Sequence, residues 1–154
     1  MIKSTSFLRK FRFLPEQVER NHQNAQNDLK IARQIACPSV RFNYSYTSLI
    51  KAGIALLSCK QLKARSVPGH HSMIIEYLAD VLGDRAIADI GEAMRSLRNQ
   101  DFYGGGILMT DKDNREYLQF AERVINEVER RIRQLLRTRE KKWAFLNKKS
   151  PLNP

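Results

Sequence analysis

Residues 42–57, FNYSYTSLIKAGIALL, decide the fold class of this chain. Apolar and aromatic side chains recur in this stretch every three or four residues, which is the spacing of one broad face of an α-helix. Ser39 can cap this helix, and we expect the helix to run to about Leu62. Such a wide apolar face is typical of the central helix of a bundle, and Gly53 predicts a close crossing with a second helix.

The same periodicity predicts four further helices. Pro38, Gly83 and the glycine run 104–106 separate consecutive predicted helices, and the Thr110 region offers a cap for the last helix. The expected ranges are 15–36, 70–82, 84–103, and 111 to beyond 136. No strand-like alternation and no internal repeat stands out in the sequence. The predicted fold class is therefore all-α, an antiparallel bundle of about five helices.

The net charge of +11 is concentrated at the two ends of the 154 residues. Residues 1–13 contain four basic and no acidic residues, and residues 130–154 contain nine basic residues and one acid. We expect a basic arm over 1–13, a helical domain over 14–137, and a basic, disordered tail over 138–154. This layout favours a polyanionic partner whose binding is sensitive to salt. Tails that only increase solubility are the alternative.

The sequence predicts a cytoplasmic protein that uses no membrane, metal or cofactor. It contains no apolar run of about 18 residues, and Arg9, Lys10 and Arg12 interrupt the first apolar-rich stretch. A basic organellar targeting segment at the N-terminus is the alternative. Cys37 and Cys59 form no CxxC pair and have no His nearby at the spacing of metal ligands, so they predict no metal site.

The densest cluster of functional side chains is the segment Arg95-Ser-Leu-Arg98-Asn99-Gln-Asp101-Phe-Tyr103-Gly-Gly. It lies where a predicted helix ends in a glycine-rich loop, and such ends hold side chains in open positions. On a helix, Arg95, Arg98 and Phe102 share one exposed ridge, and Asp101 can orient the Arg98 guanidinium from the next turn. A local Arg98–Asp101 salt bridge with Tyr103 as a packing anchor is the structural alternative.

A helix with Arg-Asn, followed by Tyr or His five residues after the Arg and then by small residues, resembles the signature turn of HEPN domains. Two more segments resemble the aromatic-rich second helix and the His-bearing turn of that family: Arg41-Phe-Asn-Tyr44-Ser-Tyr46 and Gly69-His70-His71. The order and spacing of the five predicted helices are also similar to the family over about residues 15–136.

The resemblance implies a connection to RNA. Many HEPN proteins are ribonucleases of toxin–antitoxin, CRISPR or anti-phage systems, and others bind nucleotides or partner a nucleotidyltransferase. In the nuclease members, a dimer pairs two Arg-x(4–6)-His motifs that cleave RNA without metal. Arg98 and Asn99 match that motif, but Tyr103 takes the place of the His, and no His follows it. A tyrosine with a pKa of about 10 is a poor general base at neutral pH.

Two functions follow from this resemblance. The first is a non-catalytic or atypical protein that binds RNA or a nucleotide, as a homodimer, with a nucleotidyltransferase or an antitoxin as a further candidate partner. Its predicted contact residues are Arg41, Tyr44, Tyr46, Arg95, Arg98 and Asn99. The second is a metal-independent endoribonuclease, whose general base would come from His70, His71 or another chain. Its candidate catalytic residues are His70, His71, Arg98 and Tyr103.

A third possibility does not depend on the resemblance. The basic segment 130–149 could dock a helical adaptor on an acidic protein or on ribosomal RNA, with Trp143 and Phe145 as aromatic anchors. A membrane surface is a weaker version of the same idea, because the last helix needs its apolar stripe for the core.

Overall fold

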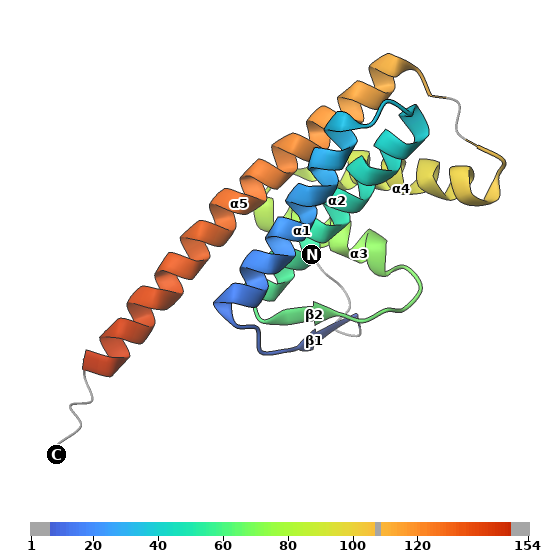
Figure 1. The fold of residues 1–154 in the computed structure, drawn as a ribbon. Helices are drawn as coiled ribbons and strands as arrows, with labels where there is room; N and C mark the ends of the chain where they lie inside the picture. Colours follow the sequence, from blue (N-terminus) through green and yellow to red (C-terminus); the bar gives the residue numbers. More distant parts are fainter. Residues whose placement is uncertain (1–6, 107–108, 149–154) are drawn as a thin grey trace.

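The structure is a computed structural model that describes residues 7–106 and 109–148, apart from the side chains of Phe102 and Tyr103. Five helices and one small sheet make up this part of the chain (Figure 1). In chain order the elements are β1 (Leu8–Lys10), α1 (Pro15–Gln34), α2 (Pro38–Cys59), β2 (Leu62–Ala64), α3 (His70–Leu82), α4 (Arg85–Tyr103) and α5 (Asp111–Lys148). The predicted all-α fold class is confirmed.

Local sequence signals set most of the helix boundaries. Gly83 ends α3 in the left-handed conformation, with φ of 68°, which glycine adopts without steric cost. The Asp84 carboxylate then accepts a hydrogen bond of 3.0 Å from the Ala86 N–H and so caps α4. The Thr110 hydroxyl accepts one of 3.1 Å from the Asp113 N–H at the start of α5. The predicted starts of both helices are confirmed.

The start of α2 differs from the prediction. Pro38 is the first residue of the helix and Cys37 is the N-cap residue, so Ser39 is not the cap. Proline suits the first helical position because its fixed φ matches the helix and its missing N–H would have no partner there.

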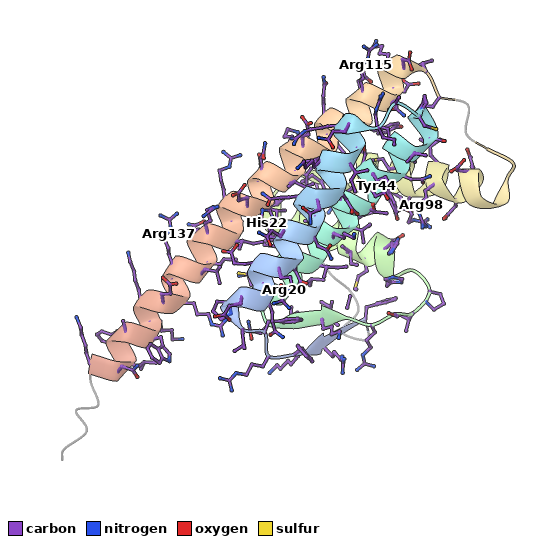
Figure 2. The ribbon with its side chains drawn as sticks, in the orientation of Figure 1. Arg20, His22, Tyr44, Arg98, Arg115 and Arg137 are labelled. Carbon is purple, nitrogen blue, oxygen red and sulfur yellow. The ribbon has the colours of Figure 1, made fainter. Side chains whose placement is uncertain are left out.

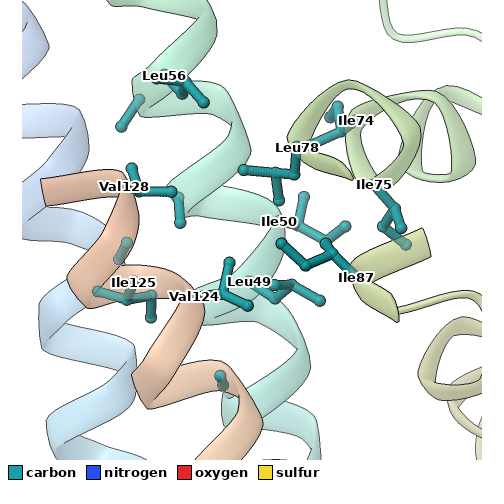
Figure 3. Close-up of a cluster of buried hydrophobic side chains, with 14 of the residues drawn as sticks. Leu49, Ile50, Leu56, Ile74, Ile75, Leu78, Ile87, Val124, Ile125 and Val128 are labelled. Atoms are coloured by element: carbon teal, nitrogen blue, oxygen red, sulfur yellow. The ribbon is translucent and has the colours of Figure 1, made fainter. Parts of the chain in front are cut away.

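The central position predicted for α2 is confirmed. Leu49, Ile50 and Leu56 of this helix are at most 5% exposed, and they meet apolar side chains from three other helices (Figure 3). These partners are Ile74, Ile75 and Leu78 of α3, Ile87 of α4, and Val124, Ile125 and Val128 of α5. Burying one such aliphatic side chain contributes about 1.5–3 kcal/mol. One apolar helix therefore organises the whole bundle.

The two short strands were not predicted from the sequence. β1 and β2 pair antiparallel, with Arg9 opposite Lys63, and Leu8 and Leu62 pack against the core. The prediction of a basic arm over 1–13 is therefore wrong for residues 8–13, which are held against the domain; residues 1–6 lie outside the described residues. Three-residue strands are too short to show alternation, so only the tertiary contacts reveal them.

The last helix extends into the segment that was predicted to be a tail. α5 continues to Lys148, so the prediction of disorder is wrong for 138–148, while 149–154 lie outside the described residues. Arg, Lys and Glu are good helix formers, and helix propensity extends α5 beyond the part that the core needs. Trp143 and Phe145 are 69% and 56% exposed on this extension.

The close crossing predicted at Gly53 is confirmed. A Cβ atom added at this position would overlap the Ile74 Cγ2 methyl group and lie 3.3 Å from Leu78 Cδ1. Gly91 of α4 makes the equivalent contact with Ile75, whose Cγ2 would lie 2.6 Å from an added Cβ. Both helices therefore pack against α3 at positions where they have no side chain.

We predict that Gly53→Ala destabilises the protein by about 1–3 kcal/mol, because overpacking the crossing outweighs the gain of roughly 1 kcal/mol in helix propensity. Urea unfolding followed by circular dichroism measures this change. The matched control is Ser96→Ala, at an exposed position of α4, which should shift the free energy of unfolding by less than about 0.5 kcal/mol. A Gly53→Ala variant as stable as wild type would contradict the close crossing.

Candidate functional site

The histidine pair predicted at the start of α3 lies on its first turn. Gly69 precedes it with φ of 81°, a left-handed conformation that turns the chain from the β2 loop into the helix. The His70 and His71 rings pack against each other with centroids 4.4 Å apart. The turn thus presents two adjacent imidazoles beside α2.

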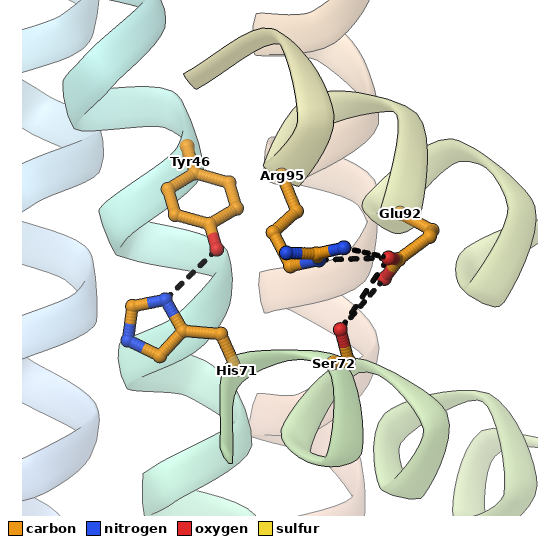
Figure 4. A network of polar contacts seen from close by, with 5 residues as sticks. All are labelled: Tyr46, His71, Ser72, Glu92 and Arg95. Carbon is orange, nitrogen blue, oxygen red and sulfur yellow. Dashed lines mark hydrogen bonds and ion pairs between the residues drawn. The ribbon is translucent and has the colours of Figure 1, made fainter. Parts of the chain in front are cut away.

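Tyr46 of α2 and His71 of α3 share a hydrogen bond of 2.9 Å between the tyrosine hydroxyl and the imidazole Nδ1 (Figure 4). Burial raises the pKa of Tyr46 to about 12. Burial, followed by electrostatic interactions with His70 and Arg98, lowers the pKa of His71 to about 4. Both groups are therefore uncharged at pH 7, and the bond joins a phenol to a neutral imidazole.

The α4 arginines approach the same pair. The Arg98 guanidinium lies over the Tyr46 ring, 5.4 Å from its centroid. Arg95 donates to Glu92 through Nε at 2.7 Å, and its Nη2 lies 2.5 Å from the same carboxylate oxygen. The other Glu92 oxygen accepts a bond of 3.1 Å from the Ser72 hydroxyl (Figure 4). Three helices therefore converge on one polar cluster.

The sequence predicted an exposed ridge of Arg95, Arg98 and Phe102 on α4, and for the two arginines this prediction was wrong; the Phe102 side chain lies outside the described residues. Arg95 and Arg98 are only partly exposed, and both face the polar side chains of α2 and α3. The physical reason is that Glu92, which also accepts a hydrogen bond from Ser72 of α3, pairs with Arg95, while the Tyr46 ring offers Arg98 a cation–π contact.

The hydrogen bond of His70 determines its tautomer. Its Nδ1 lies 2.8 Å from the Val67 carbonyl oxygen, which can only accept. Nδ1 must therefore carry the proton, and in the neutral ring Nε2 holds the lone pair. His71 differs, because its bond to the Tyr46 hydroxyl is compatible with either tautomer. His70 Nε2 is thus the defined proton acceptor of the histidine pair.

The structure separates two predicted contact residues from this cluster. Arg41 donates two hydrogen bonds, of 3.2 and 2.8 Å, to the Ile35 carbonyl and closes the α1–α2 connection. Tyr44 shares a helical face with Thr47 and Lys51, and both of these residues contact Asp28 of α1. Arg41 and Tyr44 therefore do not join Tyr46 at the α3–α4 side of α2.

The end of α4 holds the remaining predicted residues. Asp101 accepts a hydrogen bond of 3.2 Å from the Asn43 side-chain amide of α2. Asn99 is partly buried one residue after Arg98. The Tyr103 side chain lies outside the described residues, so its proposed catalytic role stays a prediction. The structure brings together His70, His71, Tyr46, Arg95 and Arg98.

Glu92 and Ser72 belong to the cluster but were missed in the sequence. Glu92 precedes Arg95 by three residues, a helical spacing that brings opposite charges together and could have identified this pair. Ser72 carries no such signal, because its contact with Glu92 depends on how α3 packs against α4.

The basic extension of α5 lies away from this cluster. Figure 2 shows Arg137 on α5 and Arg98 on α4 at well-separated places. Trp143, Leu136, Leu14 and Pro15 line a largely apolar hollow of about 420 Å³ between α5 and the start of α1. The predicted docking of this segment on an acidic partner stays a prediction.

Comparisons with known proteins assign no family. No family model matches the chain, and neither a curated protein nor a solved structure matches it. Within the described residues, no cluster of three or more His, Cys, Asp or Glu side chains could hold a metal ion. No helix in this part of the chain is both long and apolar enough to cross a membrane.

We predict that His71 titrates near pH 4 in the folded protein, because burial and nearby positive charge disfavour the imidazolium. Replacing Arg98 with Gln should raise this pKa, since one of these charges is removed. A pH titration of the imidazole ¹⁵N chemical shifts measures both values. His71 titrating at its ordinary value of about 6.5 would contradict the buried hydrogen bond to Tyr46.

The same lowered pKa predicts how stability depends on pH. Between about pH 6.5 and pH 4 the unfolded chain binds a proton at His71 that the folded chain does not, so stability is complete above this window and falls as the pH falls through it. Burial lowers the pKa of His22 as well and adds a loss of the same sign. Urea unfolding of wild type and His71→Asn isolates the His71 part, and the variant should lose less stability over this range. Equal losses in the two proteins would contradict the prediction.

Proposed function

We propose that this chain is a HEPN-like protein that binds RNA or a nucleotide at the cluster of Tyr46, His70, His71, Arg95 and Arg98. The observation that carries the proposal is the packing of Arg98 over Tyr46, whose hydroxyl bonds His71. Guanidinium groups and imidazole N–H groups are donors suited to phosphate oxygens and base edges. A half-buried arginine held over an aromatic ring is also ordered before a ligand arrives, which lowers the entropy lost on binding.

The pKa values support binding more than catalysis. Proton transfer is efficient when the pKa of the acid or base is near the working pH. Tyr46, with a pKa of about 12, and His71, with a pKa of about 4, both lie far from neutrality. As a phenol and a neutral imidazole, they serve better as hydrogen-bonding groups than as an acid and a base.

A metal-independent ribonuclease is the second candidate, and the His70 tautomer favours it. Because Nδ1 donates to the Val67 carbonyl, Nε2 of the neutral ring is left as a proton acceptor near the His71–Arg98 pair. Cleavage by 2′-OH attack needs such a base and a cation that stabilises the negative charge on the phosphate. His70 and Arg98 would fill these roles without the histidine that Tyr103 replaces.

We predict that Arg98→Ala weakens binding of a labelled single-stranded RNA by about tenfold or more, since hydrogen bonds to charged groups contribute about 1.5–3 kcal/mol. Fluorescence anisotropy in EDTA measures the affinity, and a gel of the same samples detects cleavage. The matched control is Arg123→Ala, which removes an arginine that pairs with Asp84 on another face. Equal affinity of the Arg98→Ala variant and wild type would contradict the proposed site.

The same gel separates the two candidates. Binding without cleavage is expected for the non-catalytic protein. Cleavage in EDTA that is lost in both Arg98→Ala and His70→Ala, but kept in Arg123→Ala, would instead establish the ribonuclease. Cleavage that persists in both site variants would point to a contaminating nuclease and would remove the support for the second candidate.

A further inference from the structure

The polar cluster has little excess positive charge of its own. Arg95 is paired with Glu92, and Asp101 lies on the same helix one turn after Arg98. A long polyanion therefore needs a further source of positive charge close to the cluster. The β1–β2 sheet and its flanks provide one, and the loop after β2 leads directly into the first turn of α3 (Figure 1).

The two strands and their flanks carry six cations and no acid. We call this set the basic ribbon, and its members are Arg9, Lys10, Arg12, Lys60, Lys63 and Arg65. All six are exposed, and none of them forms an ion pair with a described residue.

Two arginines elsewhere on the domain differ from the ribbon cations because they form ion pairs. Arg33 pairs with Glu122 at 2.6 Å, and Arg123 pairs with Asp84 at 3.0 Å. These pairs neutralise the surface where they occur. The ribbon cations have no such pairs with described residues. An anion therefore gains more electrostatic stabilisation at the ribbon than beside these paired arginines.

The two faces of the ribbon have separate roles. Leu8, Leu62 and Ala64 occupy one face and pack against the core, which accounts for the presence of the sheet. The register places Arg9 and Lys63 directly opposite each other on the other face. Like charges directly opposite on paired strands are destabilising, so the fold itself gains nothing from this pair.

An aromatic ring lies close to both of these charges. Phe11 is 37% exposed, and its ring centroid lies 5.7 Å from the Arg9 guanidinium carbon and 4.9 Å from the Lys63 ammonium nitrogen. Phe11, Lys10, Arg12 and Lys60 also line a hollow of about 380 Å³ with Gln61 and Leu62. Cations that flank an exposed ring beside a hollow are suited to a ligand with both phosphates and flat bases.

We propose that the basic ribbon binds single-stranded RNA, with Arg9, Lys63 and Arg65 contacting phosphates and Phe11 stacking on a base. The choice of RNA over another polyanion rests on the proposed function of the neighbouring cluster. The bound strand follows the ribbon toward His70, so the ligand is a polynucleotide and not a free nucleotide. An unpaired strand is required, because the bases of a duplex are stacked on one another and do not offer their faces to a side chain.

The test is the affinity of a labelled 20-nucleotide single-stranded RNA across a salt series, with full-length wild type beside three variants. Arg9→Gln/Lys63→Gln removes two ribbon charges. Arg33→Gln/Arg123→Gln is the matched control and removes two paired charges elsewhere. Phe11→Leu removes the ring but keeps an apolar side chain. Thermal unfolding confirms that each variant is folded.

We expect the ribbon double variant to bind about tenfold or more weakly at low salt and to have a salt slope smaller by about 1.4, because each phosphate that is no longer neutralised on a single strand reduces the slope by about 0.7. Phe11→Leu should bind the single strand about fivefold or more weakly and an RNA duplex of the same length as tightly as wild type does. The matched control should behave as wild type within about twofold.

Other outcomes would overturn the proposal in distinguishable ways. If the ribbon double variant binds as the control does while Arg98→Ala still loses affinity, the ribbon is not a binding surface and the proposed function stands. If Phe11→Leu weakens duplex and single strand equally, the stacking role is wrong. If wild type binds no RNA but binds vesicles containing phosphatidylserine, both the ribbon proposal and the proposed function fail.

Discussion

The packing of α3 between α2 and α4 is the constraint on which the candidate site depends. Adjacent residues Ile74 and Ile75 of α3 fill two positions that lack side chains, Gly53 on α2 and Gly91 on α4. Each contact brings α3 closer to one neighbour than larger residues would permit. Because His71 lies one turn before Ile74, the same packing carries its ring to the α2 tyrosine and places α4 alongside.

This packing also explains the electrostatics of the cluster. Burial between the helices moves the pKa values of Tyr46 and His71 further from neutrality, and the two uncharged groups share a hydrogen bond. The charged groups beside this pair are partly exposed, and there Glu92 offsets the charge of Arg95 and the Tyr46 ring contacts Arg98. A buried neutral pair and a rim of charged groups together form a site that can accept an anion without first rearranging.

The positive charge of the molecule is held on ordered elements as well as near the chain ends. The β1–β2 sheet holds part of it against the domain, and α5 carries much of the rest along its exposed extension. Arg139 connects the two regions through a hydrogen bond of 3.4 Å to the Phe13 carbonyl. Charges on ordered elements lose less conformational entropy on binding than charges on flexible arms, which favours a defined path for a polyanion.

Linear sequence patterns were sufficient to predict the five helices, the central place of the helix beginning near residue 38, the start of the fourth helix near Asp84, and the positions of Gly53, Gly83 and Thr110 as packing or capping residues. These features depend on spacing and on contacts within a few residues, so a linear pattern contains them. The patterns also identified the arginines and histidines of the cluster as candidates. They did not reveal that His71 and Arg98 both contact Tyr46.

That convergence, the roles of Glu92 and Ser72, the separation of Arg41 and Tyr44, and the pairing of β1 with β2 emerged only from the three-dimensional packing. The first of these requires knowing how α3 sits between its neighbours, and the last joins strands more than fifty residues apart along the chain. Such contacts follow from the packing of apolar faces across the whole bundle, which no local stretch of sequence encodes.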